Sequence, residues 1–236
     1  MPSFPAGVVS FRACISLSEV NNPGCPWNKT NYSEEELKQR AERNDRNIDE
    51  LIRIANENSD VINAVSVGNE NTPDWGENNV PVERLISFAK KLRKETGKQV
   101  TFNEGVYEWE HLKELADELD IISIHSYPLW NGNTVEEALE VNKTWYKKVK
   151  EWYPGKPIVF SEVGWATDCA DFKQMKEGQA NEETRRDIMK SSGNGVTGNR
   201  LFLICLKLLT SLGKVEIDLM KQKNIGEYST KTELQS

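Results

Sequence analysis

The segment VINAVSVGNE, residues 61–70, is an apolar run that ends on a charged residue, Glu70, directly after Gly68 and Asn69. A second segment has the same form, because KPIVFSEVGW, residues 156–165, places Glu162 at the end of an apolar run. Short apolar runs of this kind indicate strands that are buried on both faces. Both glutamates are therefore expected where a buried strand ends.

Around these two segments, strand and helix patterns alternate along the chain. Ser33 and Glu36 have the spacing of a capping box, which predicts the start of a helix. The expected helices cover residues 33–55, 82–97, 112–119, 135–152 and 180–190, and the expected strands cover residues 61–67, 100–102, 121–124 and 158–160. Such an alternation predicts an α/β fold with a parallel sheet and helical crossovers. A doubly wound sheet and a (β/α)8 barrel both fit this pattern.

The ends of the expected strands favour the barrel. Each strand ends in polar residues: Asn69 and Glu70, Asn103 and Glu104, His125 and Tyr127, and Glu162. In a barrel these ends converge on one rim, where the active sites of that fold lie. A doubly wound sheet more typically carries a glycine-rich phosphate turn, and the sequence contains neither GxGxxG nor GxxxxGK[ST]. We therefore expect a (β/α)8 barrel of the TIM type.

Composition excludes several other classes of protein. The formal net charge of −7 argues against nucleic acid or an anionic membrane surface as the main partner. The cysteines and histidines show no CxxC pair and no zinc-ligand spacing: they are Cys14, Cys25, Cys169, Cys205, His111 and His125. No apolar run reaches the roughly twenty residues of a membrane span, and the opening MPSFPAGVVSF lacks the pattern of a signal peptide. We expect no metal and no cofactor.

Glu70 and Glu162 form the candidate catalytic pair. Two other expected strands lie between the strand that ends at Glu70 and the strand that ends at Glu162. The two carboxyl groups are therefore expected to face each other across the mouth of the barrel. Glycoside cleavage uses two such groups, one to protonate the leaving oxygen and one to attack the anomeric carbon or to activate water. The alternative is that each is an ordinary strand-end glutamate on a solvated rim.

Three motifs in this order, VGNE, HSYP and SEVGWAT, resemble the retaining glycoside hydrolases that share the (β/α)8 fold. The longer segments NAVSVGNE, DIISIHSYPLWNG and KPIVFSEVGWAT most resemble family 17 in its bacterial branch, which comprises β-1,3-glucanases and related glucanosyltransferases. The resemblance covers about residues 33–190. It implies a retaining hydrolase that acts on β-1,3-glucan polysaccharide or oligosaccharide. We expect a monomer with no nucleic-acid partner and no membrane segment.

The resemblance also assigns roles to single residues. Glu70 matches the acid/base, Glu162 matches the nucleophile, and Asn69 matches the residue that hydrogen-bonds the sugar 2-hydroxyl group. Tyr127 matches a tyrosine that contacts the nucleophile. Further substrate-binding candidates are Glu104, Tyr107, Trp109, His125, Trp130 and Trp165. The three tryptophans are candidate stacking surfaces for sugar rings, with packing as the alternative. His125 is expected to act as a hydrogen-bonded scaffold rather than as an acid or base.

Both ends of the chain depart from the family pattern. A complete barrel needs about three strands before residue 62, and only residues 7–17 offer a candidate, so one or two βα units are expected to be missing. After residue 190 the native eighth strand is not recognisable. CLKLLTSLGK, residues 205–214, is compatible with codons that encode MFEAFDEPWK when read one base earlier, and that segment is family-like. We therefore expect a partial catalytic barrel domain over residues 1–190 and a frameshifted tail over residues 191–236.

Other functions remain open from the sequence. The same two glutamates would serve a transglycosylase, in which a sugar acceptor replaces water in the second step. The irregular ends also allow an inactive glucan-binding remnant. A non-sugar α/β enzyme is a further alternative, although the sequence supplies neither a nucleotide-binding loop nor a Ser-His-Asp set.

Overall fold

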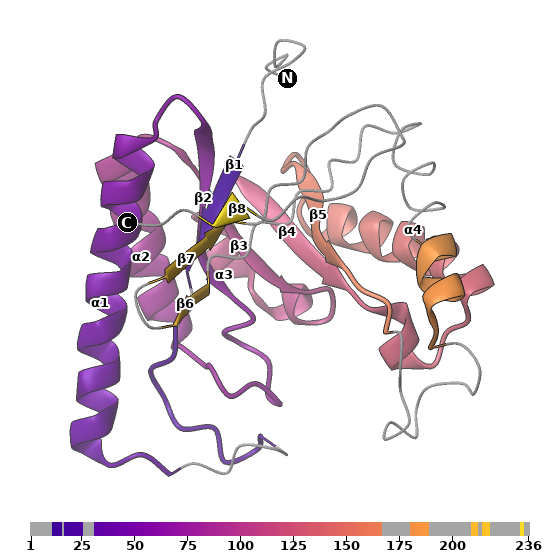
Figure 1. The fold of residues 1–236 in the computed structure, drawn as a ribbon, viewed down its shortest axis with the longest axis horizontal. Coiled ribbons are helices and arrows are strands. Elements are labelled where there is room, and N and C mark those ends of the chain that lie inside the picture. The colour runs from indigo at the N-terminus through magenta and orange to yellow at the C-terminus, as the bar shows by residue number, and fades with distance from the viewer. Residues whose placement is uncertain are drawn as a thin grey trace.

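The computed structural model describes residues 11–15, 17–25, 31–166 and 180–188, together with three short strands further on. The elements of the main body follow the order β1 (Phe11–Cys14), α1 (Glu34–Glu57), β2 (Ile62–Asn69), α2 (Val82–Thr96), β3 (Gln99–Gly105), η1 (Glu108–His111), α3 (Lys113–Asp117), β4 (Ile121–Ser126), η2 (Pro128–Asn131), α4 (Val135–Trp152) and β5 (Ile158–Val163) (Figure 1). Residues 182–188 form one further helical segment.

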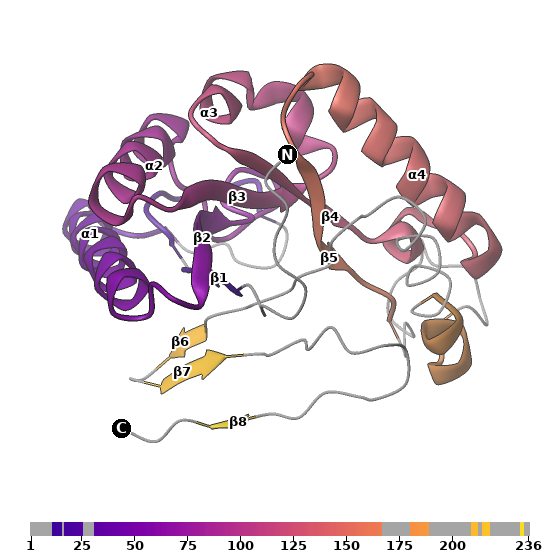
Figure 2. The same ribbon diagram turned by 90° about the horizontal axis from the view of Figure 1, so that it is seen from above.

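The five strands β1 to β5 form one sheet in which every neighbouring pair is parallel and the strand order equals the chain order. The sheet is curved, and α1 to α4 all lie along its outer side (Figure 2). A doubly wound sheet would carry helices on both faces. The fold is therefore the α/β fold of a (β/α)8 barrel, and in the described residues it is incomplete because the sheet does not close.

Local sequence signals fix the helix boundaries. At the start of α1, the Ser33 hydroxyl accepts a hydrogen bond from the Glu36 N–H at 3.3 Å and the Glu36 carboxylate accepts one from the Ser33 N–H at 2.8 Å, which is the expected capping box. α2 ends at Gly97, which has a φ of +63° and donates its N–H to the carbonyl of Arg93. α4 covers residues 135–152, as the sequence predicts.

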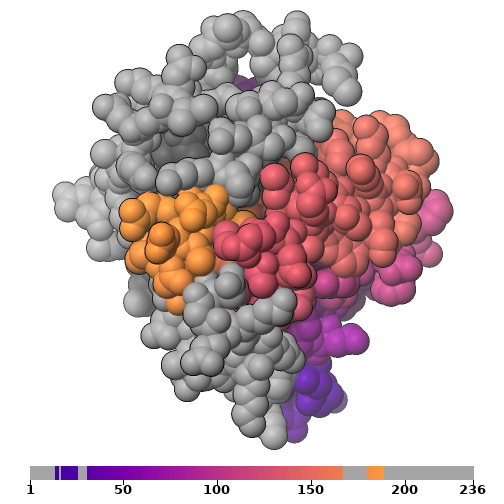
Figure 3. All heavy atoms as spheres, turned by 90° about the vertical axis from the view of Figure 1, so that its right-hand side faces the viewer, coloured from indigo at the N-terminus to yellow at the C-terminus, as the bar shows by residue number. Residues whose placement is uncertain are grey.

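The hydrophobic core fills the space between the sheet and the helices. Its largest fully buried aliphatic side chains include Leu51 of α1, Leu85 and Leu92 of α2, and Ile122 and Ile124 of β4. Removing each such side chain from water contributes about 1.5–3 kcal/mol to folding. A smaller second cluster joins Leu129, Ala138, Trp165 and Ile188. It lies where residues 182–188 pack beside η2 and the start of α4 (Figure 3).

Some expected elements differ in extent. Each of β2 to β5 continues past its apolar run, so the polar residues at the run ends belong to the strands or follow them directly. The helix expected at residues 112–119 is shorter, because α3 has only five residues and the 3-10 turn η1 precedes it. β1 falls within the expected strand at residues 7–17, while residues 7–10 and 16 lie outside the described part. The expected helix at residues 180–190 is confirmed for 182–188, and its last two residues are not described.

Beyond residue 188 the structure describes three short strands, β6 (Leu209–Ser211), β7 (Lys214–Ile217) and β8 (Thr232–Glu233). They form a separate antiparallel sheet in the order β6-β7-β8. The division at residue 190 and the frameshifted tail remain predictions, which the sequence of the coding DNA would test. In the described residues, no helix combines the length and the apolar character needed to cross a membrane.

Candidate active site

Glu70 lies immediately after β2, in an unusual backbone conformation. Its φ of +50° is the only positive φ among the described non-glycine residues. Such a conformation is unfavourable for a residue with a side chain and needs support from its surroundings. The Glu70 N–H supplies part of that support by donating to the carbonyl of Asn103 on β3 at 2.9 Å.

Asn71 fixes the loop that follows Glu70. Its side chain is fully buried, donates to the carbonyls of Leu17 (3.0 Å) and Asn78 (2.6 Å), and accepts from the Asn69 N–H at 2.8 Å. A side chain on Gly68 would overlap the Asn71 side-chain oxygen, so this position requires glycine. Sequence reasoning missed Asn71, because its partners are backbone groups, one of them in a segment 54 residues away, and no motif marks them.

The strand register brings the polar strand ends to one edge of the sheet. Asn69 pairs with Asn103, Gly105 pairs with His125, and His125 pairs with Glu162. Glu70 follows β2 and Glu104 precedes Gly105, so both belong to the same edge. β2 and β5 are three steps apart in the sheet, as expected from the sequence.

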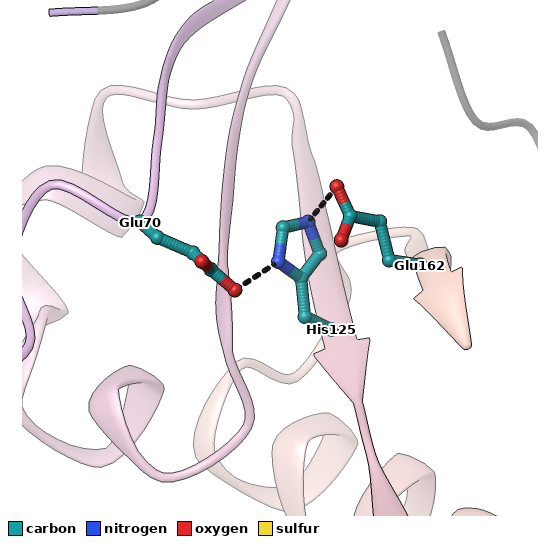
Figure 4. A group of neighbouring side chains, drawn as sticks. All are labelled: Glu70, His125 and Glu162. Atoms are coloured by element: carbon teal, nitrogen blue, oxygen red, sulfur yellow. Dashed lines mark hydrogen bonds and ion pairs between the residues drawn. The ribbon is translucent and has the colours of Figure 1, made fainter. Parts of the chain in front are cut away.

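His125 lies between the two candidate catalytic glutamates (Figure 4). Its Nδ1 is 2.8 Å from Glu70 Oε1, and its Nε2 is 3.5 Å from Glu162 Oε1. The His125 side chain is 1% exposed, whereas those of Glu70 and Glu162 are 30% and 19% exposed. The burial of the imidazole gives a ligand little access to it, and its contacts match the expected scaffold role better than a sugar contact.

One side-chain oxygen of Glu70, one of Glu162 and a ring nitrogen of His125 lie within 4.8 Å of one another. Within the described residues these three side chains are the group that could hold a metal ion. However, the imidazole turns a different nitrogen to each carboxylate, so it does not direct one lone pair at an ion shared by both. Their arrangement fits paired carboxylate chemistry, which needs no metal.

Glu162 is held by Tyr127, whose hydroxyl donates a short hydrogen bond to Glu162 Oε2. This contact agrees with the tyrosine–nucleophile contact that the sequence resemblance implies. Gly164 makes room for it, because a side chain at that position would overlap the ring of Tyr127. The Gly164 N–H also donates to the carbonyl of Ser126 at 3.1 Å.

Glu104 is fully buried, which favours a structural role over the sugar contact expected from the sequence. Its Oε2 accepts from the Thr72 hydroxyl at 2.8 Å and from the Thr72 N–H at 3.2 Å, and its Oε1 accepts from the Gly105 N–H at 2.8 Å. Burial, helped by the nearby charge of Glu70, raises the pKa of Glu104 to about 7 despite these hydrogen bonds.

The three candidate tryptophans occupy different environments. Trp109 is fully buried, donates to the carbonyl of Ser123 at 3.1 Å and packs edge-on against Phe102 and Tyr153. These contacts favour packing, the alternative to sugar stacking. Trp165 is 7% exposed and donates to the Thr184 hydroxyl, which indicates packing.

Aromatic surface is nevertheless exposed near the strand ends. Trp130, in the turn after β4, is 38% exposed and Tyr107, just after β3, is 49% exposed. Trp75, in the loop that follows Glu70, is 46% exposed and was not among the sequence candidates. Asn69, the last residue of β2, is half-buried. These groups therefore remain candidates for sugar contacts.

Residues 31–204 match the BtgE/BtgC glycoside hydrolase domain. The chain belongs to this family. The sequence-based prediction of a glycoside hydrolase is confirmed at this level. The match to the BtgE/BtgC domain includes Glu70, His125 and Glu162 and ends before β6. No curated protein sequence gives a significant match.

Solved structures show the same fold as this BtgE/BtgC domain. The family 17 β-1,3-glucanosyltransferase from Rhizomucor miehei has a TM-score of 0.58 and 21% identity, over 70% of this chain and 60% of that chain. An active-site mutant of the Rhizomucor miehei enzyme in complex with laminaritriose gives the same values. A β-glucuronidase from Ruminococcus gnavus in complex with uronic isofagomine has a TM-score of 0.53 and 15% identity, over 78% of this chain and 33% of that chain. The chain thus spans less than two thirds of the length of these proteins.

Proposed function

We propose that this chain is a retaining glycosidase that cleaves β-1,3-glucan, with Glu70 as acid/base and Glu162 as nucleophile. The observation that carries the proposal is the closeness of one oxygen from each carboxylate, within 4.8 Å. In retaining enzymes the two carboxyl groups are about 5–5.5 Å apart, whereas inverting enzymes separate them by roughly 6.5–9.5 Å to admit a water molecule. The separation supports the retaining mechanism.

The surroundings of each glutamate suit its role. The Tyr127 hydrogen bond holds Glu162 Oε2, so the orientation of the nucleophile is fixed before substrate binds. Glu70 Oε1 is engaged by His125 Nδ1, which leaves Oε2 to carry the proton that the leaving oxygen receives. In the first step Glu70 would protonate the glycosidic oxygen while Glu162 attacks the anomeric carbon. In the second step Glu70 would take a proton from water, which displaces Glu162.

β-1,3-Glucan is the substrate class favoured by the family 17 motifs VGNE, HSYP and SEVGWAT. The fold-level likeness to a β-1,3-glucanosyltransferase, one form of which binds laminaritriose, is in line with that class. The likeness also keeps glucanosyl transfer as the second candidate. In that reaction a sugar hydroxyl group replaces water in the second step, and the two glutamates keep their roles.

Product analysis of the full 236-residue chain tests the proposal. The chain is incubated with laminari-oligosaccharides and with β-1,4- and β-1,6-linked oligosaccharides, beside matched Glu70→Gln and Glu162→Gln variants. The proposal is supported if the chain cleaves only the β-1,3-linked substrate and both variants lose this activity. Products longer than the substrate identify transfer. Binding of the β-1,3-linked substrate without turnover would instead indicate an inactive glucan-binding remnant.

A further inference from the structure

The loop that carries Glu70 is attached to β3 on both sides of the Glu70 side chain. Before it, the Glu70 N–H donates to the carbonyl of Asn103. After it, Thr72 donates both its hydroxyl and its N–H to Glu104 Oε2, at 2.8 and 3.2 Å. Thr72 is only two residues from Glu70, so the Thr72–Glu104 contact restrains the residues that must hold Glu70 at a φ of +50°.

We propose that Glu104 is a positioning residue for Glu70: acting through Thr72, it sets the place of the acid/base carboxyl group against His125. The inference rests on the proposed role of Glu70. It assigns to Glu104 a task that needs no contact with sugar, which agrees with its complete burial.

The Glu104 carboxyl group is itself firmly oriented. Its other oxygen accepts from the Gly105 N–H at 2.8 Å, and Gly105 pairs with His125 across β3 and β4. The charged groups that face it are Glu70, whose charge repels it, and His125, which attracts it when protonated. Glu104 therefore connects to the Glu70–His125 pair by hydrogen bonds through Thr72 and by charge directly.

The test compares Thr72→Val, which removes the hydroxyl donor, with Thr72→Ser, which keeps it. Thr101→Val is the matched control, because Thr101 is a fully buried threonine on β3 whose hydroxyl donates to the carbonyl of Ile121 at 2.9 Å, away from the loop. Each variant of the full chain is assayed with an unactivated laminari-oligosaccharide and with a dinitrophenyl laminarioside. The dinitrophenyl leaving group needs little protonation, so in the first step, which kcat/KM reports, only the unactivated substrate depends on a well-placed acid.

A positioning role predicts a selective loss. Thr72→Val should lower kcat/KM for the unactivated substrate by about tenfold and for the dinitrophenyl substrate by less than about twofold. Thr72→Ser and Thr101→Val should remain within about twofold of the unmodified chain on both substrates. Equal losses on the two substrates in Thr72→Val, or no loss at all, would overturn the proposal.

Nuclear magnetic resonance of His125 provides a second measurement that does not need turnover. The Nδ1 signal reports its contact with Glu70, and in Thr72→Val it should move toward its position in Glu70→Ala, while in Thr101→Val it should stay in place. An unmoved signal in Thr72→Val overturns the positioning role. If instead Glu70→Ala shows no selective loss on the unactivated substrate, the proposed function of Glu70 fails, and the two failures are thus distinguished.

Discussion

The ring of Tyr127 occupies the space that a side chain at Gly164 would need, and the hydroxyl of the same ring holds Glu162. The residue after β5 and the residue after β4 are thus fitted to each other around the proposed nucleophile. Gly164 does not need a left-handed conformation, since its φ is not among the positive values. Its requirement for glycine is steric.

Gly164→Ala should therefore displace Tyr127 and disturb the orientation of Glu162. We expect kcat to fall by about a hundredfold, as for other misplacements of a reacting group. Gly105→Ala is the matched control, because a methyl group there would meet nothing closer than Glu108 Cγ at 3.8 Å. Steady-state kinetics of both variants, with circular dichroism to confirm folding, checks the prediction. Equal activity in the two variants would contradict it.

The buried Glu104 predicts a dependence of stability on pH. Its pKa is about 7 in the folded protein and 4.5 for an ordinary glutamate, so between these pH values the folded protein holds a proton that the unfolded chain has released. The stabilisation is complete below pH 4.5 and is lost as the pH rises through about 7. The loss amounts to on the order of 3 kcal/mol in the free energy of unfolding.

Glu104→Gln removes this ionisation and should flatten that part of the curve. Urea unfolding at a series of pH values gives the free energy of unfolding of the unmodified chain and of the variant. In the difference between the two, the contributions of the other titrating groups largely cancel. Parallel stability curves from pH 4.5 to 7 would show that Glu104 does not titrate there.

Trp109 and Trp130 should respond to truncation in opposite ways. Trp109→Ala removes a fully buried ring and its hydrogen bond, so we expect a loss of about 3–5 kcal/mol in the free energy of unfolding. Trp130→Ala removes a ring that is 38% exposed, so it should affect stability far less and instead raise KM for laminari-oligosaccharides. Denaturant unfolding measures the effect of each substitution on stability, and steady-state kinetics measures its effect on KM. A raised KM in Trp109→Ala with unchanged stability would contradict this assignment.

Glu70→Ala tests the acid/base role with an activated substrate. A dinitrophenyl laminarioside should still form the covalent intermediate, which then accumulates because no base activates water. Added azide should release it as a glycosyl azide of retained configuration, identified by nuclear magnetic resonance. If Glu70→Ala hydrolyses unactivated glucan at the normal rate, Glu70 is not the acid/base.

The sequence predicts most of the fold because its local signals are strong. The apolar runs before Glu70 and Glu162 and the capping box at Ser33 depend on neighbours along the chain, and each appears where expected. The convergence of the strand ends was also predictable, because parallel strands bring their carboxyl ends to one edge.

What the sequence does not show is which polar strand-end residues are buried. Glu104 and Tyr107 both follow the apolar run of β3, yet Glu104 is buried under Thr72 from another loop and Tyr107 is exposed. Trp109 is covered in part by Tyr153, which is 44 residues further along the chain. Such contacts depend on tertiary packing, which a motif does not encode.

Trapping the covalent intermediate tests the central claim most directly. The full chain is treated with a fluoride derivative of a 2-deoxy-2-fluoro laminarioside, which forms the glycosyl-enzyme and slows its hydrolysis, and the labelled peptide is identified by mass spectrometry. The account predicts one sugar on Glu162, and no label in Glu162→Gln. A label on Glu70 or on another residue, or turnover without any covalent intermediate, would contradict it.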